Sequence, residues 1–216
     1  MQGTSPAEKV SSVVPSQVLP DRGHRLIDLI FEVPEEMNSL LFWGRAAIWV
    51  GMIVWGSQLM FVRIADNVAG ESLLHLVNLP FHEAGHVVFS PLGSFIASLG
   101  GTLGQLLVPL VCMAALLFKT RDPFGASVCF WWFGENFLDI APYVNDARAG
   151  KLPLVGGNFG HSSPYGFHDW EYLLTESGLL RYDHVLARVA HGIGSVLMIL
   201  AVVWAGFLWY RQYQRR

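Results

Sequence analysis

The sequence has few charged residues. Among its 216 residues only 14% are Asp, Glu, Lys or Arg, whereas 52% are hydrophobic and eight are Trp. Soluble domains carry about 25% charged residues. The composition therefore indicates an integral membrane protein with the lipid bilayer as its partner. The formal net charge of −3 is not the basic excess that attracts nucleic acid, so we exclude nucleic acid as a partner.

Cysteine is also scarce. Cys112 and Cys129 both lie in apolar runs, which argues against a disulfide framework and against a cysteine-ligated zinc site. The N-terminal region shows no signal-peptide pattern, because its first long apolar run begins near Leu40. We expect a flexible tail over 1–38, which contains either an interfacial helix at 24–33 or an irregular polar linker. A single polytopic membrane domain over 39–216 follows, with a polar loop at 148–183.

The apolar runs predict an all-α integral membrane protein with four or five transmembrane helices. Residues 46–62, 103–118 and 189–210 are apolar and carry at most one charge near an end, as spanning helices require. In the segment 73–91, Pro80 and Pro91 leave a helix of about 11 residues, or about 16 Å, against a hydrocarbon core of about 30 Å. This short or broken helix spans only if 73–79 continues it through a kink. Otherwise the segment enters the membrane and returns to the same side.

The central motif is His-Glu-Ala-Gly-His at residues 82–86. On a helix, positions four apart lie about 40° from each other, so His82 and His86 can present two imidazole nitrogens to one zinc ion. Glu83 is placed to act as general base on a zinc-bound water. The alternative is a chance match with both histidines packed in the core. Ionisable residues inside a membrane are costly and usually functional, which favours the metal site.

Neighbouring residues predict how this helix begins and packs. Asn78 is a good N-cap, and Pro80 suits the first helical turn. Gly100 and Gly104 are four apart, a spacing that lets two helices approach closely. The glycine pair at 100–101 fits a loop equally well.

A second unusual segment covers residues 125–147. Glu135, Asp139 and Asp146 lie within about 40° of one another on a helical wheel, and Pro142 should kink or end the helix. Three carboxylates on one stripe of a membrane helix need an explanation. A metal partner is one, and a water-filled cavity or a helix end at the interface is another.

The motif on a short membrane helix, followed by acidic residues on a later one, resembles the site-2 protease family of intramembrane zinc metalloproteases. The resemblance covers roughly residues 73–147 and includes His82, Glu83, Gly85 and His86. It implies that the histidines and a downstream aspartate hold Zn²⁺ and that Glu83 activates water. The family usually places its aspartate in an Asn-Pro…Asp-Gly context, whereas residues 135–147 read ENFLDIAPYVNDA. There is also no room for an inserted PDZ domain, so the chain resembles a minimal, divergent member.

The third metal ligand therefore has three candidates, namely Asp146, Asp139 and His168, since zinc accepts carboxylate and imidazole. We favour Asp146, because a kink at Pro142 can turn the following residues inward, where 168–169 could close the site. Carboxylates that do not bind the metal could orient the ligands.

The expected function is hydrolysis of peptide bonds in a membrane-embedded or membrane-proximal protein substrate. One alternative is a non-catalytic membrane protein that binds or transports metal ions. Another is a membrane haem protein with axial histidines such as His86 and His191. Glu83 separates these hypotheses, because only a hydrolase needs an acid beside the first histidine.

The basic residues predict a topology. Arg22, Arg25 and Arg45 precede the first span, Lys119 and Arg121 lie in a short loop, and three arginines end the chain. The positive-inside rule places all three groups on the cytoplasmic side. This requires residues 73–100 to enter and leave on one side, with four full spans.

Overall fold

The computed structural model describes residues 22–33 and 38–216, with the backbone alone for 22–26. In this part of the chain the fold is all-α and has no strand. The expected tail over residues 1–21 lies outside the described residues. The α-helices are α1 (Arg22–Phe31), α2 (Ser39–Met60), α3 (Leu73–Phe89), α4 (Ser94–Ala115), α5 (Pro123–Asp146), α6 (Asp169–Glu176) and α7 (Asp183–Tyr213).

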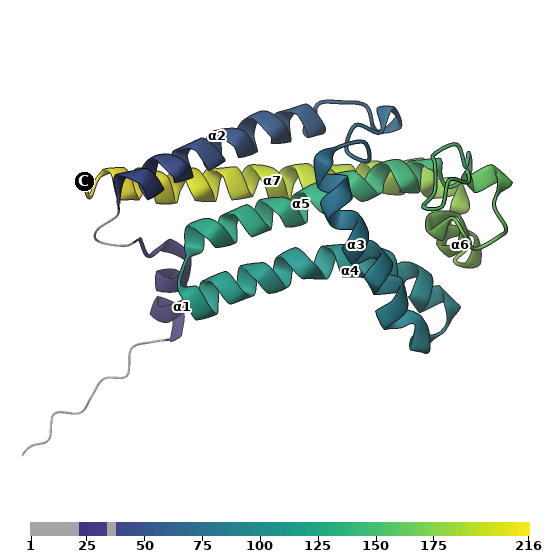
Figure 1. The fold of residues 1–216 in the computed structure, drawn as a ribbon, viewed down its shortest axis with the longest axis horizontal. Coiled ribbons are helices and arrows are strands. Elements are labelled where there is room, and N and C mark those ends of the chain that lie inside the picture. Colours follow the sequence, from purple (N-terminus) through teal and green to yellow (C-terminus); the bar gives the residue numbers. More distant parts are fainter. Residues whose placement is uncertain (1–21, 34–37) are drawn as a thin grey trace, which may run out of the picture.

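Four long helices, α2, α4, α5 and α7, lie along the long axis of the molecule (Figure 1). Three helical segments are long and apolar enough to cross a membrane, namely Ser39–Met60, Ser94–Thr120 and Leu180–Tyr213. The structure thus agrees with a membrane protein. Helix α5 has 24 residues but carries the buried carboxylates of Glu135 and Asp139.

Helix α3 crosses the bundle obliquely and begins earlier than expected (Figure 1). Its N-cap is Ser72, whose hydroxyl accepts a hydrogen bond from the backbone N–H of His75. Asn78, the expected cap, is instead buried inside the helix, and Pro80 is also internal. The side chain of Asn78 is engaged by α5, because Trp132 Nε1 donates to its Oδ1 at 2.7 Å. The 17 residues of α3 extend about 25 Å.

Glycines allow α3 and α4 to cross closely. A Cβ atom on Gly85 would strike the carbonyl oxygen of Gly100, and one on Gly104 would strike the carbonyl oxygen of Phe81. Gly100 and Gly104 therefore lie inside α4 as a helix-packing face, and not in a loop. This crossing places the histidines of α3 directly against α4.

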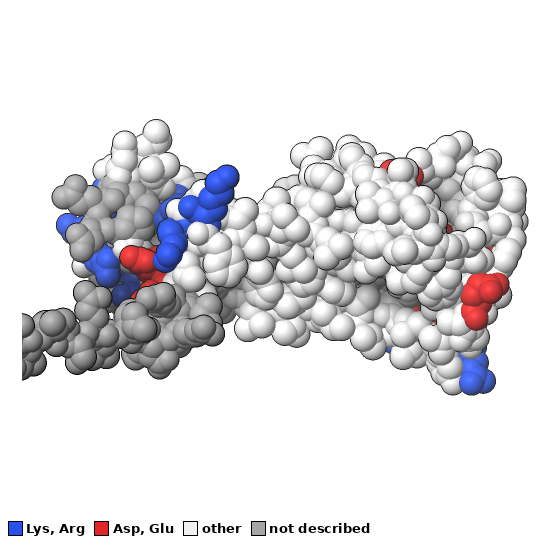
Figure 2. Space-filling view, turned by 90° about the horizontal axis from the view of Figure 1, so that it is seen from below, with Lys and Arg blue, Asp and Glu red and all other residues white. Residues whose placement is uncertain are grey.

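Charged side chains gather at the two ends of the molecule, and the surface between them on the face in Figure 2 is free of charge. At the end that holds the C-terminus, Arg45 of α2 pairs with Asp122 at 2.9 Å. Arg211 of α7 and Arg215, two residues after the end of α7, donate to the carbonyl oxygens of Phe31 and Val33, which anchors α1 there. Residues 147–182 lie at the opposite end (Figure 1). An uncharged band between two polar ends is the pattern that a bilayer requires.

Candidate metal centre

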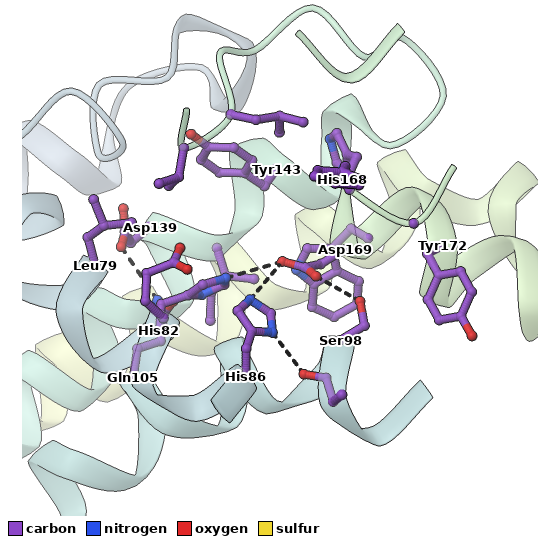
Figure 3. Close-up of a pocket in the computed structure, with 18 of the residues that line it drawn as sticks. Leu79, His82, His86, Ser98, Gln105, Asp139, Tyr143, His168, Asp169 and Tyr172 are labelled. Atoms are coloured by element: carbon purple, nitrogen blue, oxygen red, sulfur yellow. Dashed lines mark hydrogen bonds and ion pairs between the residues drawn. The ribbon is translucent and has the colours of Figure 1, made fainter. Parts of the chain in front are cut away.

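The two motif histidines converge on a carboxylate from a distant part of the chain (Figure 3). Nε2 of His82 and Nε2 of His86 each lie 3.2 Å from Oδ2 of Asp169, the first residue of α6. The potential ligand atoms of these three residues all lie within 4.8 Å of one another. The third residue at the histidines is therefore Asp169, in place of the expected Asp146.

Both imidazoles are held in the orientation that a metal ligand needs. Nδ1 of His86 lies 2.8 Å from the carbonyl oxygen of Ala97. Because a carbonyl only accepts, Nδ1 carries a proton, and Nε2 is the ring nitrogen that faces Asp169 and would bind a metal after losing its own proton. Nδ1 of His82 lies 2.6 Å from Oε1 of Gln105, which gives the same assignment. A second hydrogen bond of this kind is the usual support for a metal-bound histidine.

The orientation of Gln105 follows from a chain of hydrogen bonds that ends on the backbone of α5. The amide of Asn136 donates to the carbonyl oxygen of Trp132 at 2.9 Å, so Asn136 Oδ1 faces Gln105. Gln105 Nε2 donates to that oxygen at 3.1 Å, which leaves Gln105 Oε1 to accept from His82. Backbone geometry thus sets the orientation of the His82 ring.

Gly101 provides the space between the two rings. A Cβ atom at this position of α4 would lie 2.5 Å from Nε2 of His82 and 2.5 Å from Nε2 of His86. Contacts this short are a steric clash. A bare backbone at residue 101 therefore lets both imidazole rings lie directly against α4 with their Nε2 atoms close together.

Asp169 has the charge that a metal ligand requires. Burial of the Asp169 carboxyl by itself raises its pKa, but hydrogen bonds from His82, His86 and Ser98 hold that pKa well below its usual range. Ser98 of α4 contacts the other carboxylate oxygen, Oδ1, at 2.7 Å. The carboxylate is therefore ionised near neutral pH and held from two sides.

The start of α6 determines where Asp169 points. His168 is the N-cap of this helix, and its Nδ1 accepts a hydrogen bond from the backbone N–H of Glu171 at 3.2 Å. Since His168 satisfies the free N–H group, the carboxylate of Asp169 is available to the histidines of α3. The other ring nitrogen of His168, Nε2, lies 3.8 Å from Oδ2 of Asp146, and His168 is not among the three residues that converge.

The other two carboxylate candidates have different partners. Asp146 ends α5 and accepts hydrogen bonds from the backbone N–H groups of Lys151 and Leu152 at 3.0 and 2.8 Å, so it shapes the following turn. Asp139 is buried and accepts from His75 and Asn78, each at 2.9 Å. Gln105 Nε2 lies 3.5 Å from it, which links Asp139 indirectly to the ligand His82.

A cavity of about 720 Å³ opens over the cluster, and both motif histidines, Asp169 and Glu83 line it. Glu83 is exposed, so its carboxylate can reach a molecule in the cavity. His191 lies elsewhere, in α7, where it contacts the backbone of Leu59, and it does not line this cavity. The structure thus does not bring His86 and His191 together.

Asp169 was absent from the sequence-based candidates. The available signal was its position directly after His168, in the longest polar connection of the chain. A residue in this position could equally cap the helix that follows, but the structure gives that role to His168.

Comparisons of the chain with protein-family models, with curated proteins and with solved structures gave no match.

Proposed function

We propose that the protein is an intramembrane zinc metallopeptidase similar to the site-2 protease family. The observation that carries this proposal is the convergence of two Nε2 atoms and one carboxylate oxygen beside Glu83, in a cavity at one end of an apolar helix bundle. Two histidines and one carboxylate form a donor set typical of catalytic zinc, which keeps a fourth position for water or substrate.

The residues present fit a zinc ion. His82, His86 and Asp169 would hold it, because acceptors hold Nδ1 of both imidazoles and direct both Nε2 atoms at the carboxylate, and because Gly101 leaves room for both rings. When bound, zinc would act as a Lewis acid toward the peptide carbonyl and lower the pKa of water toward about 7.

The protein's own groups would then transfer the protons and hold the metal-binding histidines in place. Glu83 would accept the proton of the attacking water and deliver it to the leaving amine, the usual role of a general base that becomes a general acid. Gln105 and the carbonyl of Ala97 would hold the histidines in place. The cavity walls would exclude bulk water and leave room for an extended segment of a substrate protein.

The membrane arrangement is part of the proposal. Helices α2, α4, α5 and α7 would be four full spans, and α3 would enter and leave on the side of residues 147–182. The first part of α2, the connection between α4 and α5 and the C-terminus lie at the opposite end (Figure 1). These segments carry Arg45, Lys119 and the C-terminal arginines, so this end would be cytoplasmic by the positive-inside rule. Substrates would be membrane-embedded or membrane-proximal polypeptides that reach the cavity.

The experiment that tests this function combines metal analysis with proteolysis. We expect about one zinc per purified chain, lost in His82→Ala and His86→Ala and retained in His184→Ala. The control residue, His184, is exposed and contacts Asn145 away from the cavity. A library of synthetic peptides with apolar segments should be cleaved by the wild type, inhibited by a zinc chelator and restored by zinc.

Zinc that is absent from fresh wild type, or unchanged in both histidine variants, would contradict the site. Zinc binding without any chelator-sensitive cleavage would favour the alternative of a metal-binding or transport protein.

A further inference from the structure

A third histidine of α3 faces the same cavity as the motif. His75 lies seven residues before His82, which on a helix is about 20° around the axis and about 10.5 Å along it. It lines the cavity together with both motif histidines. The metal centre does not use His75, because its ring contacts a different carboxylate.

That carboxylate orients the ring. Nδ1 of His75 lies 2.9 Å from Oδ1 of Asp139, whose side chain is 2% exposed, whereas that of His75 is 19% exposed. The ring of Tyr143 is parallel to the imidazole within 12°, at a centroid distance of 6.2 Å. With Nδ1 held by an acceptor, Nε2 points away from Asp139, and it has no hydrogen-bond partner among the described residues.

The surroundings of Asp139 favour a positively charged ring. The amide nitrogen of Asn78 donates both to Asp139, at 2.9 Å, and to the buried Glu135, at 3.0 Å, so two acids share one small polar cluster. Among the described residues, His75 is the one cationic group within hydrogen-bond distance of either acid. An opposite charge stabilises an imidazolium, and an imidazolium donates from Nε2.

We propose that His75 is a substrate-binding residue, whose Nε2–H donates a hydrogen bond to an oxygen of the bound polypeptide about three residues from the scissile bond. The distance follows from the helix, since about 10.5 Å along α3 corresponds to about three residues of an extended chain at roughly 3.3 Å each. The acceptor is a peptide carbonyl or a C-terminal carboxylate. This inference rests on the proposed peptidase function.

The test uses binding, and it needs no known substrate. The probes are peptide hydroxamates, in which the hydroxamate binds zinc and one to five Leu and Ala residues extend from it. One series extends toward the C-terminus, with either a free carboxylate or an amide at its end, and a second extends toward the N-terminus. Dissociation constants are measured by calorimetry on zinc-loaded protein in detergent.

In the wild type we expect the affinity for the probes of one series to rise about tenfold when the third residue is added. A tenfold rise is the scale of a hydrogen bond from a charged donor. In His75→Ala this gain should vanish while the shortest probe binds unchanged. Asp139→Asn should also lose the gain, because a neutral amide no longer stabilises the imidazolium that donates from Nε2, and His184→Ala should keep it. A gain that requires the free carboxylate identifies a terminal carboxylate as the acceptor, and a gain with the amide identifies a peptide carbonyl.

An equal length dependence in the wild type and His75→Ala would overturn the role of His75 and leave the peptidase proposal intact. A uniform loss of affinity at every length, in both His75→Ala and Asp139→Asn, would indicate a purely structural role and would also overturn it. If no probe binds the zinc-loaded wild type, the proposed function fails, and this inference fails with it.

Discussion

Oδ2 of Asp169 lies 3.2 Å from Nε2 of His82, although the two residues are 87 positions apart in the sequence. This contact joins α6 to α3, two elements that the chain connects only through α4, α5 and the long polar connection. A metal ion held by both would therefore also fix residues 147–182 over the cavity.

Asp169→Asn should lower zinc occupancy strongly, because a neutral amide is a poor zinc ligand. Asp146→Asn should keep its zinc and lose about 1 kcal/mol of stability, since its carboxylate accepts two backbone hydrogen bonds in a turn. Elemental analysis and thermal unfolding of both variants measure these effects. If Asp146→Asn loses zinc and Asp169→Asn retains it, the third ligand is Asp146, as the sequence had suggested.

Gly101→Ala should abolish zinc binding although it removes no ligand. The added methyl group would lie 2.5 Å from both Nε2 atoms and would push both ligand rings out of place. Gly51→Ala and Gly192→Ala are matched controls, because an added Cβ meets nothing within 4 Å at either position. These controls should bind zinc normally and gain slightly in stability, since alanine favours a helix over glycine. Normal zinc affinity in Gly101→Ala would show that the metal lies elsewhere.

Gln105→Leu should weaken zinc affinity about 10–100-fold, the usual cost of losing a partner that orients a ligand. Leucine is similar in size but offers no acceptor to Nδ1 of His82. The effect should be smaller than that of His82→Ala, which removes the ligand itself. Competition with a fluorescent zinc chelator gives the zinc dissociation constants of both variants. An unchanged zinc affinity in Gln105→Leu would show that Gln105 does not support the site.

The membrane arrangement can be tested by cysteine labelling. With Cys112 and Cys129 replaced by serine, single cysteines at Thr120, Asn158 and Gln214 report on the two ends. We expect positions 120 and 214 to react from one side of sealed vesicles and position 158 to react from the other. Labelling of positions 120 and 214 from opposite sides would exclude four full spans with a re-entrant α3.

Local sequence patterns predicted the parts of the site that depend on one helix. The four-residue spacing of His82 and His86 does place both rings together, and the spacing of Gly100 and Gly104 does allow α3 to approach. Both properties follow from helix periodicity alone.

The remaining parts depend on contacts between distant segments. The helical wheel indicated that Asp139 and Asp146 share a stripe of α5, but it could not show which of them reaches α3. Asp139 does so through Asn78 and His75, whereas Asp146 turns toward the following loop. The predicted start of α3 was wrong for a related reason. The side chain of Asn78 contacts α5 from inside the helix, and the N-cap is Ser72.

The most direct test of the account is Glu83→Gln, measured for zinc content and peptide cleavage on the same purified sample. Glu83 lines the cavity but is not among the three residues that converge, so we expect about one zinc per chain to remain bound. Cleavage should fall by about 10²–10⁴-fold, the usual share of general acid–base catalysis. Full cleavage with Glu83→Gln, or zinc lost together with the carboxylate, would contradict the proposed mechanism.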